Sequence, residues 1–342
     1  MKKIGLFYIA VVTSMFIALA LSITLGAANI PIRTVLAVLW SQIPGANVVG
    51  DWAESVSTIL LRVRLPHTIL VALTGAALAG SGAAYQGLFR NPLADSYLIG
   101  VASGAGLGAV IALSLPWASA QFGLYLIPVA AFIGAILTVA IVYSLARVNG
   151  YVPLTTLLLA GVAVGAFASA LTSFFMLRSN EQVVRALAFL LGGSPVSGWE
   201  PVIAVLPYML LGLSLLAISG HPLNVLQFGE DQARQMGLNA GRVKTFLIIV
   251  ASLTTAAAVS FSGVIGFIGL VVPHLFRLLW GSDYRHLIPL SMLGGVTALL
   301  VADVIARTII APQSLPIGIV TSLAGAPFFL WILRRAKREV FW

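Results

Sequence analysis

The stretch from Leu124 to Ala146 reads LYLIPVAAFIGAILTVAIVYSLA and carries no charged side chain. A helix needs about 20 mostly apolar residues to cross the hydrocarbon core of a bilayer, where backbone polar groups find no water to bond with. The surrounding sequence has the same character: 60% of the 342 residues are hydrophobic, only 8% are charged, and the mean hydropathy is +1.04. We therefore expect an all-α integral membrane protein without a soluble catalytic domain.

Ten such runs lie between polar residues, glycines or prolines. The expected spans are residues 4–25, 66–86, 98–115, 124–146, 153–177, 200–218, 245–262, 264–279, 287–309 and 317–333. The first run follows Lys2 and Lys3, but it is too long for the apolar core of a secretory signal, so we interpret it as a span. The eighth contains Pro273, which predicts a short or broken helix. We expect residues 1–342 to form a single transmembrane domain.

The basic residues indicate which side of the membrane each loop occupies, because cytoplasmic loops carry an excess of Lys and Arg. Ten spans place both termini on one side, and with the N-terminus in the cytoplasm 13 of the 19 basic residues are inside and 6 are outside. The inner set is Lys2, Lys3, Arg90, Arg147, Arg234, Arg242, Lys244, Arg277, Arg285, Arg334, Arg335, Lys337 and Arg338. The outer set is Arg33, Arg62, Arg64, Arg178, Arg185 and Arg307. The net charge of +9 thus indicates topology and not nucleic-acid binding.

Small residues crowd several spans, which predicts close helix packing. One such run, residues 74–82, resembles residues 254–262 in composition, and a short irregular stretch is expected after each. Five spans separate the two runs, so they would cross in opposite directions, as in the inverted repeats of many transporters. Chance similarity between two helices rich in small residues is the alternative.

The longest expected inner loop covers about residues 219–244. Two glycines bracket a short polar helix in it, with acidic residues in the first turn and an arginine late, which suits the helix dipole. Apolar residues on its flanks would let it sit in a groove on another protein; a helix on the lipid surface or a plain connector is the alternative. The residues assigned to this surface are Gly229, Glu230, Asp231, Ala233, Arg234, Met236 and Gly237.

Charged side chains also mark the outer side. Arg64 lies just before the second span and His67 at its start, where they could anchor the helix at the headgroups or face acidic residues of an external partner. Asp303 and Arg307 stand four residues apart in the ninth span, a spacing that favours a helical ion pair, although charges inside a bundle often mark a pathway. Two further basic residues lie just beyond the fifth span and could attract an anionic ligand or anchor at the interface; they are Arg178 and Arg185.

Several chemistries have no support in this sequence. Gly-x-x-x-x-Gly-Lys-Ser/Thr is absent, so ATP is not bound by a P-loop of this chain. His-Glu-x-x-His is absent too, and Ser262 and His274 lack the context of a nucleophile and its base, so an intramembrane enzyme is not expected. With no cysteine and four histidines scattered over different loops, no metal site is expected either.

Several segments together resemble the FecCD-type permeases of bacterial ABC importers, which carry iron-siderophores, haem or vitamin B12. The segments are RLPH at 64–67, GLFRNPLAD at 87–95 leading into LIGVASGAG at 98–106, LGGS at 191–194, the loop 226–238, GVIGFIGLVVPHLFR at 263–277 and LPIGIVTSLAGAPFF at 315–329. They extend from the second expected span to the last. The resemblance therefore covers nearly the whole chain.

The resemblance implies a homodimeric permease in the cytoplasmic (inner) membrane, with two ABC ATPase subunits below it and a periplasmic or lipid-anchored substrate-binding protein outside. ATP and Mg would belong to the ATPase, and this chain would bind no cofactor. The segment from Gly229 to Gly237 would be the coupling helix. Arg64 and Arg307 would meet acidic residues of the binding protein, and His67, where many members have arginine, implies a weaker or pH-dependent contact there. The residues near the expected narrowing of the pathway are Ser169, Ala170 and Thr172.

An ion-coupled secondary transporter is the rival class. Such carriers place ionisable residues at mid-membrane, whereas here only the pair of Asp303 and Arg307 lies clearly within a span. The long charged inner loop would also have no role in such a carrier. We therefore expect an ATP-driven importer that performs no covalent chemistry in this chain, with ferric-siderophore as the first candidate cargo, cobalamin as the second and haem as the third.

Overall fold

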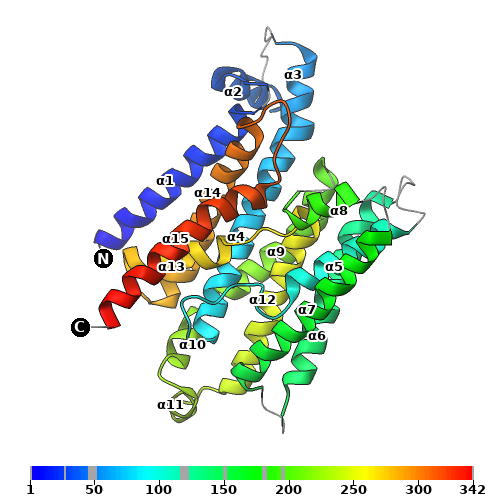
Figure 1. Ribbon diagram of the computed structural model, residues 1–342. Helices are drawn as coiled ribbons and strands as arrows, with labels where there is room; N and C mark the ends of the chain where they lie inside the picture. The colour runs from blue at the N-terminus through cyan, green and yellow to red at the C-terminus, as the bar shows by residue number, and fades with distance from the viewer. Residues whose placement is uncertain are drawn as a thin grey trace.

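The computed structural model describes residues 2–26, 28–44, 52–115, 123–148, 152–178, 183–193 and 197–340, and within this part of the chain every element is a helix (Figure 1). The helices are α1 (Lys2–Thr24), α2 (Ile32–Ser41), α3 (Glu54–Thr58), the π-helical segment η1 (Ile59–Arg64), α4 (Leu65–Leu88), α5 (Val101–Ser114), α6 (Gly123–Ala146), α7 (Leu154–Arg178), α8 (Val183–Leu190), α9 (Trp199–Ile218), α10 (Gly220–Leu226), α11 (Glu230–Gln235), α12 (Ala240–Ser262), α13 (Ile268–Trp280), α14 (Tyr284–Thr308) and α15 (Ile317–Val340).

Seven helical segments of the described chain are long and apolar enough to cross a membrane. They are α1, the continuous run from α3 to α4, α6, α7, α9, α12 and α14. The other three expected spans coincide with shorter apolar helices, namely α5, α13 and the part of α15 from Ile317 to Ile332. The protein is therefore an all-helical, multi-pass membrane protein.

Two differences from the sequence-based expectation concern prolines. The second span is expected from residue 66, but its helical run begins at Glu54 and passes through the π-helical turn η1 just before Pro66. Proline lacks a backbone donor and crowds the preceding turn, and a wider π turn relieves both problems. The eighth span is short, as expected, but the expected break at Pro273 is wrong, because Pro273 lies inside α13. The break precedes this helix, where Gly263 (φ 76°) and Phe267 (φ 69°) adopt left-handed backbone conformations.

Helix α4 forms the centre of the bundle. It is buried along its whole second half and packs against α9, α12, α13 and α14. A Cβ atom on Gly75 would overlap the backbone of Gly295 on α14, and one on Gly82 would overlap the backbone of Gly269 on α13. Glycine at these positions lets the helix backbones touch, which is how membrane helices gain packing energy without a hydrophobic driving force.

The packing supports an internal repeat. In the first half α4 packs against α14 and α5 against α6, while in the second half α12 packs against α6 and α13 against α14. The short helices α5 and α13 also begin alike, because each follows a residue with left-handed backbone, Gly100 (φ 86°) and Phe267 (φ 69°). These shared features favour the inverted repeat over chance similarity between residues 74–82 and 254–262.

Large apolar side chains cover the outside of the bundle. On α7, Leu159 is 70% exposed and Leu177 is 82% exposed, and α1 and α6 also present many exposed apolar residues. Such a surface would aggregate in water, whereas in a bilayer it faces lipid or another membrane helix. This exterior agrees with the length and composition of the helices.

The glycine contact between α4 and α14 can be tested by adding one methyl group. We expect Gly75→Ala to destabilise the protein by about 1–3 kcal/mol, the usual cost of overpacking, because the neighbouring backbone cannot give way. The measurement is thermal unfolding in detergent, followed by tryptophan fluorescence. Gly5→Ala on α1 is the matched control, since a Cβ there meets nothing within 4 Å; equal melting temperatures for the two variants would contradict the packing argument.

Candidate functional site

The functional candidates lie at two opposite ends of the bundle. Figure 1 shows α2, α3 and α8 at one end and α10 and α11 at the other. We call these the α2/α3 end and the α10/α11 end. The sequence-predicted residues Arg64, His67 and Arg307 belong to the first, and the segment from Gly229 to Gly237 belongs to the second.

At the α2/α3 end, two arginines bind the carboxyl end of α1. The Arg64 guanidinium donates hydrogen bonds to the carbonyl oxygens of Ile23 (2.9 Å) and Thr24 (3.0 Å), and also to that of Ala28. Arg307 donates to the carbonyl oxygens of Ser22 and Leu25, both at 3.1 Å. The last carbonyls of a helix have no intrahelical partner and carry partial negative charge, so cations stabilise them.

Asp303 joins this cluster from α14. Its carboxylate is only 1% exposed and accepts hydrogen bonds from Arg307 (Nε–Oδ2, 2.9 Å) and from Nε2 of His67 (Nε2–Oδ1, 2.8 Å). The hydroxyl of Ser22 lies 3.0 Å from that of Thr68 and accepts from Arg307, so α1, α4 and α14 are tied together by one polar network. The buried Asp303 carboxylate is therefore compensated by the Arg307 guanidinium and by hydrogen bonds from both side chains.

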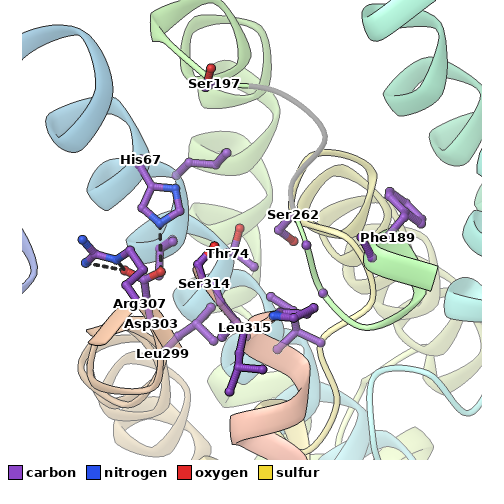
Figure 2. Close-up of a pocket in the computed structure, with 18 of the residues that line it drawn as sticks. His67, Thr74, Phe189, Ser197, Ser262, Leu299, Asp303, Arg307, Ser314 and Leu315 are labelled. Carbon is purple, nitrogen blue, oxygen red and sulfur yellow. Dashed lines mark hydrogen bonds and ion pairs between the residues drawn. The ribbon is translucent and has the colours of Figure 1, made fainter. Parts of the chain in front are cut away.

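In this structure the three residues expected to contact an external partner are engaged inside the bundle. The Arg64 side chain is buried, and in the described state both guanidinium groups are occupied by α1. His67 is directed to Asp303 and not away from the bundle (Figure 2). Contact of Arg64, His67 or Arg307 with an external partner stays a prediction, and it requires that these groups leave their present partners.

A cavity of about 560 Å³ opens beside the polar cluster (Figure 2). Its walls come mainly from α4, α8, α14, the end of α12 and the segments before α9 and α15. Most of the lining residues are apolar, among them Leu70, Phe189 and Leu299, and the hydroxyl groups come from Thr74, Ser197, Ser262 and Ser314. A mainly apolar cavity with a few polar groups is the usual make-up of a small-molecule site. Its charged wall consists of His67, Asp303, Arg307 and Arg185.

The predicted pathway residues are divided between different environments. Arg185 on α8 lines the cavity, whereas Arg178 is exposed at the end of α7. Ser169 and Ala170 are exposed on α7, but Thr172 is buried and its hydroxyl donates to the carbonyl of Ala168 (2.8 Å). The structure thus brings none of the four predicted α7 residues into the cavity.

At the α10/α11 end, α10 is fastened to the two central helices. Asn224 donates to the carboxylate of Asp283 (2.6 Å) and accepts from the backbone of Tyr284 (2.9 Å), which joins α10 to the start of α14. Gln227 donates to the carbonyl of Gly87 on α4 (2.9 Å). Hydrogen bonds from Arg285 hold the pKa of the Asp283 carboxyl below its usual range, so this anchor stays ionised at neutral pH.

Helix α11 has a bound face and an exposed face. Gly229 (φ 106°) and Gly237 (φ 82°) bracket it with left-handed backbone, as the sequence predicts. Ala233 is fully buried, and Glu230 forms an ion pair with Lys244 of α12. The exposed face consists of polar side chains together with two large apolar ones, Phe228 (64% exposed) and Met236 (63%). The exposed polar residues include Asp231 and Arg234.

Comparison with known proteins gives this arrangement its context. The family described as the FecCD transport family matches residues 14–335. The chain belongs to the FecCD transport family. It is 43% identical over 332 residues to the uncharacterized ABC transporter permease protein YvrB of Bacillus subtilis, covering 97% of this chain and 94% of that one. It is 45% identical over 287 residues to the cobalamin import system permease protein BtuC of Halobacterium salinarum, covering 84% and 76%.

Among solved structures, the FecCD chain is similar to one described as an inward-facing conformation of a metal-chelate type ABC transporter. The TM-score is 0.82 with 28% sequence identity, covering 97% of this chain and 99% of that chain. FecCD membership identifies an ABC-transporter permease, which is not itself an enzyme, and it decides against the ion-coupled carrier. The environment of Asp303 also argues against an ion-coupled carrier. Its carboxylate is already bound by His67 and Arg307, so it is poorly placed to bind a coupling ion.

Some residues of the FecCD chain that position these surfaces were missed by sequence reasoning. They are Ser22, Asn224, Gln227, Lys244 and Asp283. Asp283 could have been found, since Asp directly before an apolar helix is a typical N-cap, and its side chain accepts from the backbone of Arg285 (3.0 Å). The partners of the others lie far away along the chain and leave no local signal. Of the family segments, Ser194 lies outside the described residues.

The hydrogen bonds from Arg64 to the carboxyl end of α1 lead to a prediction about local dynamics. We expect Arg64→Met to speed amide hydrogen exchange at Leu25 and Ile30 by about tenfold, because three α1 and loop carbonyls lose their donor. The measurement is exchange mass spectrometry of the purified protein. Arg62→Met is the control because Arg62 is exposed; the same acceleration in both variants would rule out a specific clamp.

Proposed function

We propose that this chain is the channel-forming permease subunit of an ATP-driven importer for large metal chelates. The observation that carries the proposal is the α10–α11 segment. Its inner side is bonded to α4, α12 and α14, while its outer side presents Phe228 and Met236. A short helix that is held from behind and flanked by two exposed apolar side chains suits a groove on a motor subunit. The FecCD relationship supports this role for the segment.

The proposed topology has ten crossings with both termini in the cytoplasm. The α10/α11 end then faces the cytoplasm and the α2/α3 end faces outside. The distribution of 13 inner and 6 outer basic residues supports this orientation. The short helices α5, α13 and α15 would complete the ten crossings, each in a bundle where neighbours cover the irregular backbone at its ends. The membrane would be the cytoplasmic (inner) membrane.

The proposed assembly contains two copies of this chain, two ABC ATPase subunits and an external substrate-binding protein. The exposed apolar surface of α7, together with Ser169 and Ala170, would line the pathway between the copies. ATP and Mg would be bound by the ATPase and no cofactor by this chain. Motion of the ATPase would reach the membrane through α10 and α11, and no covalent chemistry would occur in the permease.

The proposed cargo is an anionic metal chelate such as a ferric-siderophore. Arg185 lines the cavity at the outer end, and Arg178 is exposed at the end of α7, so this end attracts anions. Cobalamin is the second candidate, and it is favoured by the 45% identity to a permease named for cobalamin import. Haem is the third.

The coupling surface can be tested by removing its apolar groups. We expect Phe228→Ser combined with Met236→Ser to weaken association with the ATPase at least tenfold and to reduce uptake, because two large side chains no longer leave water on docking. The measurement is co-purification and transport in proteoliposomes. Trp40→Ser with Ile43→Ser, exposed apolar residues of the α2/α3 end, is the matched control; full association of the first variant would remove the coupling assignment.

The cargo can be tested with the ATPase in nanodiscs. The permease, its ATPase and the binding protein are combined, and the binding protein is loaded with ferric-siderophore, cobalamin or haem. We expect ATP hydrolysis to rise several-fold with the ferric-siderophore form and to stay near the basal rate with the others. Stimulation by cobalamin or haem alone would reassign the cargo, and the absence of any ATPase association would contradict the importer proposal itself.

A further inference from the structure

A second cavity lies at the α10/α11 end, between α6, α12 and the start of α7. Its volume is about 930 Å³. The lining contains three basic side chains and one carboxylate, contributed by Arg147, Arg242, Lys244 and Glu230. Glu230 is engaged by Lys244, whereas Arg147 and Arg242 are exposed and form no ion pair within the part of the chain that the structure describes. The mouth of this groove is therefore positively charged.

The lining of the groove changes from polar and charged to apolar along α12. It begins at Asn239 and Arg242 and reaches Phe246 and Ile249, which are 42% and 51% exposed. The seven helical steps from Arg242 to Ile249 rise about 10 Å along the helix. Tyr143 of α6 and Thr245 of α12 also line the groove, and their hydroxyl groups form a hydrogen bond of 2.9 Å (Oη–Oγ1). One occupant of this groove would meet cations at the mouth and apolar side chains deeper in the membrane.

From this arrangement we infer that the groove binds an anionic phospholipid of the cytoplasmic leaflet, with its phosphate between Arg147 and Arg242 and its acyl chain along Phe246 and Ile249. The inference rests on the proposed orientation, which places this end in the cytoplasm. Basic pockets between membrane helices on that side suit lipid phosphates, and each nearby Lys or Arg adds to the attraction. A free phosphate would use the arginines but not the apolar wall, and a docked protein would not reach residues at hydrocarbon depth.

The bound lipid would lie against the coupling segment. Lys244 lines the groove and also holds Glu230 at the first turn of α11. An anionic headgroup next to Lys244 competes with Glu230 for the same ammonium group. The lipid would therefore change how firmly α11 is held on α12, and so connect the composition of the membrane with the coupling surface.

The experiment is native mass spectrometry of the purified permease with phosphatidylglycerol and phosphatidylcholine in equal amounts. We expect selective retention of phosphatidylglycerol, and a loss of about tenfold or more in Arg147→Gln combined with Arg242→Gln. Arg62→Gln with Arg334→Gln removes the same charge from exposed positions outside the groove and should retain the lipid. Equal loss in both double variants, or no loss in the first, overturns the inference.

Two further arms identify the occupant. Phe246→Ser with Ile249→Ser should reduce retention of phosphatidylglycerol, and millimolar glycerol 3-phosphate should not displace the lipid from the unmodified protein. Displacement by glycerol 3-phosphate would assign the groove to a soluble phosphate. If the double arginine variant keeps its lipid but loses the ATPase on co-purification, the groove is a protein contact and the lipid inference is wrong. The proposed transport function is tested separately through Phe228 and Met236. A failure of that function can therefore be told apart from a failure of the lipid inference.

Discussion

Contact between helix backbones at glycine is the constraint on which this structure depends. In a membrane the apolar surface of a helix gains nothing by leaving lipid for another apolar surface, so packing must come from close approach. The chain achieves this around α4, where Gly75 meets Gly295 and Gly82 meets Gly269. The same device recurs between α5 and α6, where Gly104 meets Gly134. Larger side chains at these points would separate the helices and open the bundle.

Because α4 is held so closely, it joins the two ends of the molecule. Its 24 residues span about 36 Å, from the polar cluster around Asp303 to the carbonyl of Gly87 that accepts from Gln227 of α10. Helix α14 covers the same distance on its neighbouring side, with Asp283 at one end and Arg307 at the other. The two helices are therefore cross-linked at both ends and packed together between them.

The sequence predicted the elements better than it predicted their contacts. All ten apolar runs became helices, because length and apolarity are local properties. The break before α13 was misplaced, since a proline inside a membrane helix is tolerated while the left-handed Phe267 has no recognisable sequence signal. The residues of the short helix between Gly229 and Gly237 were found from glycine and charge placement. The partners of Arg64 and Glu230 were not, because α1 and Lys244 approach them only in the folded chain.

The hydrogen bonds of α10 determine which helices would move together in the proposed transport cycle. A displacement of α10 must move α4 and α14 together, since Gln227 bonds to one and Asn224 to the other. Arg64 and Arg307 tie α1 to the far end of the same two helices, so α1, α4 and α14 would move as one block. Helices α5, α6 and α7 pack mainly on one another and form a second group. Opening and closing would then occur between these two groups, where α12 contacts both α4 and α6 and follows α11 in the chain.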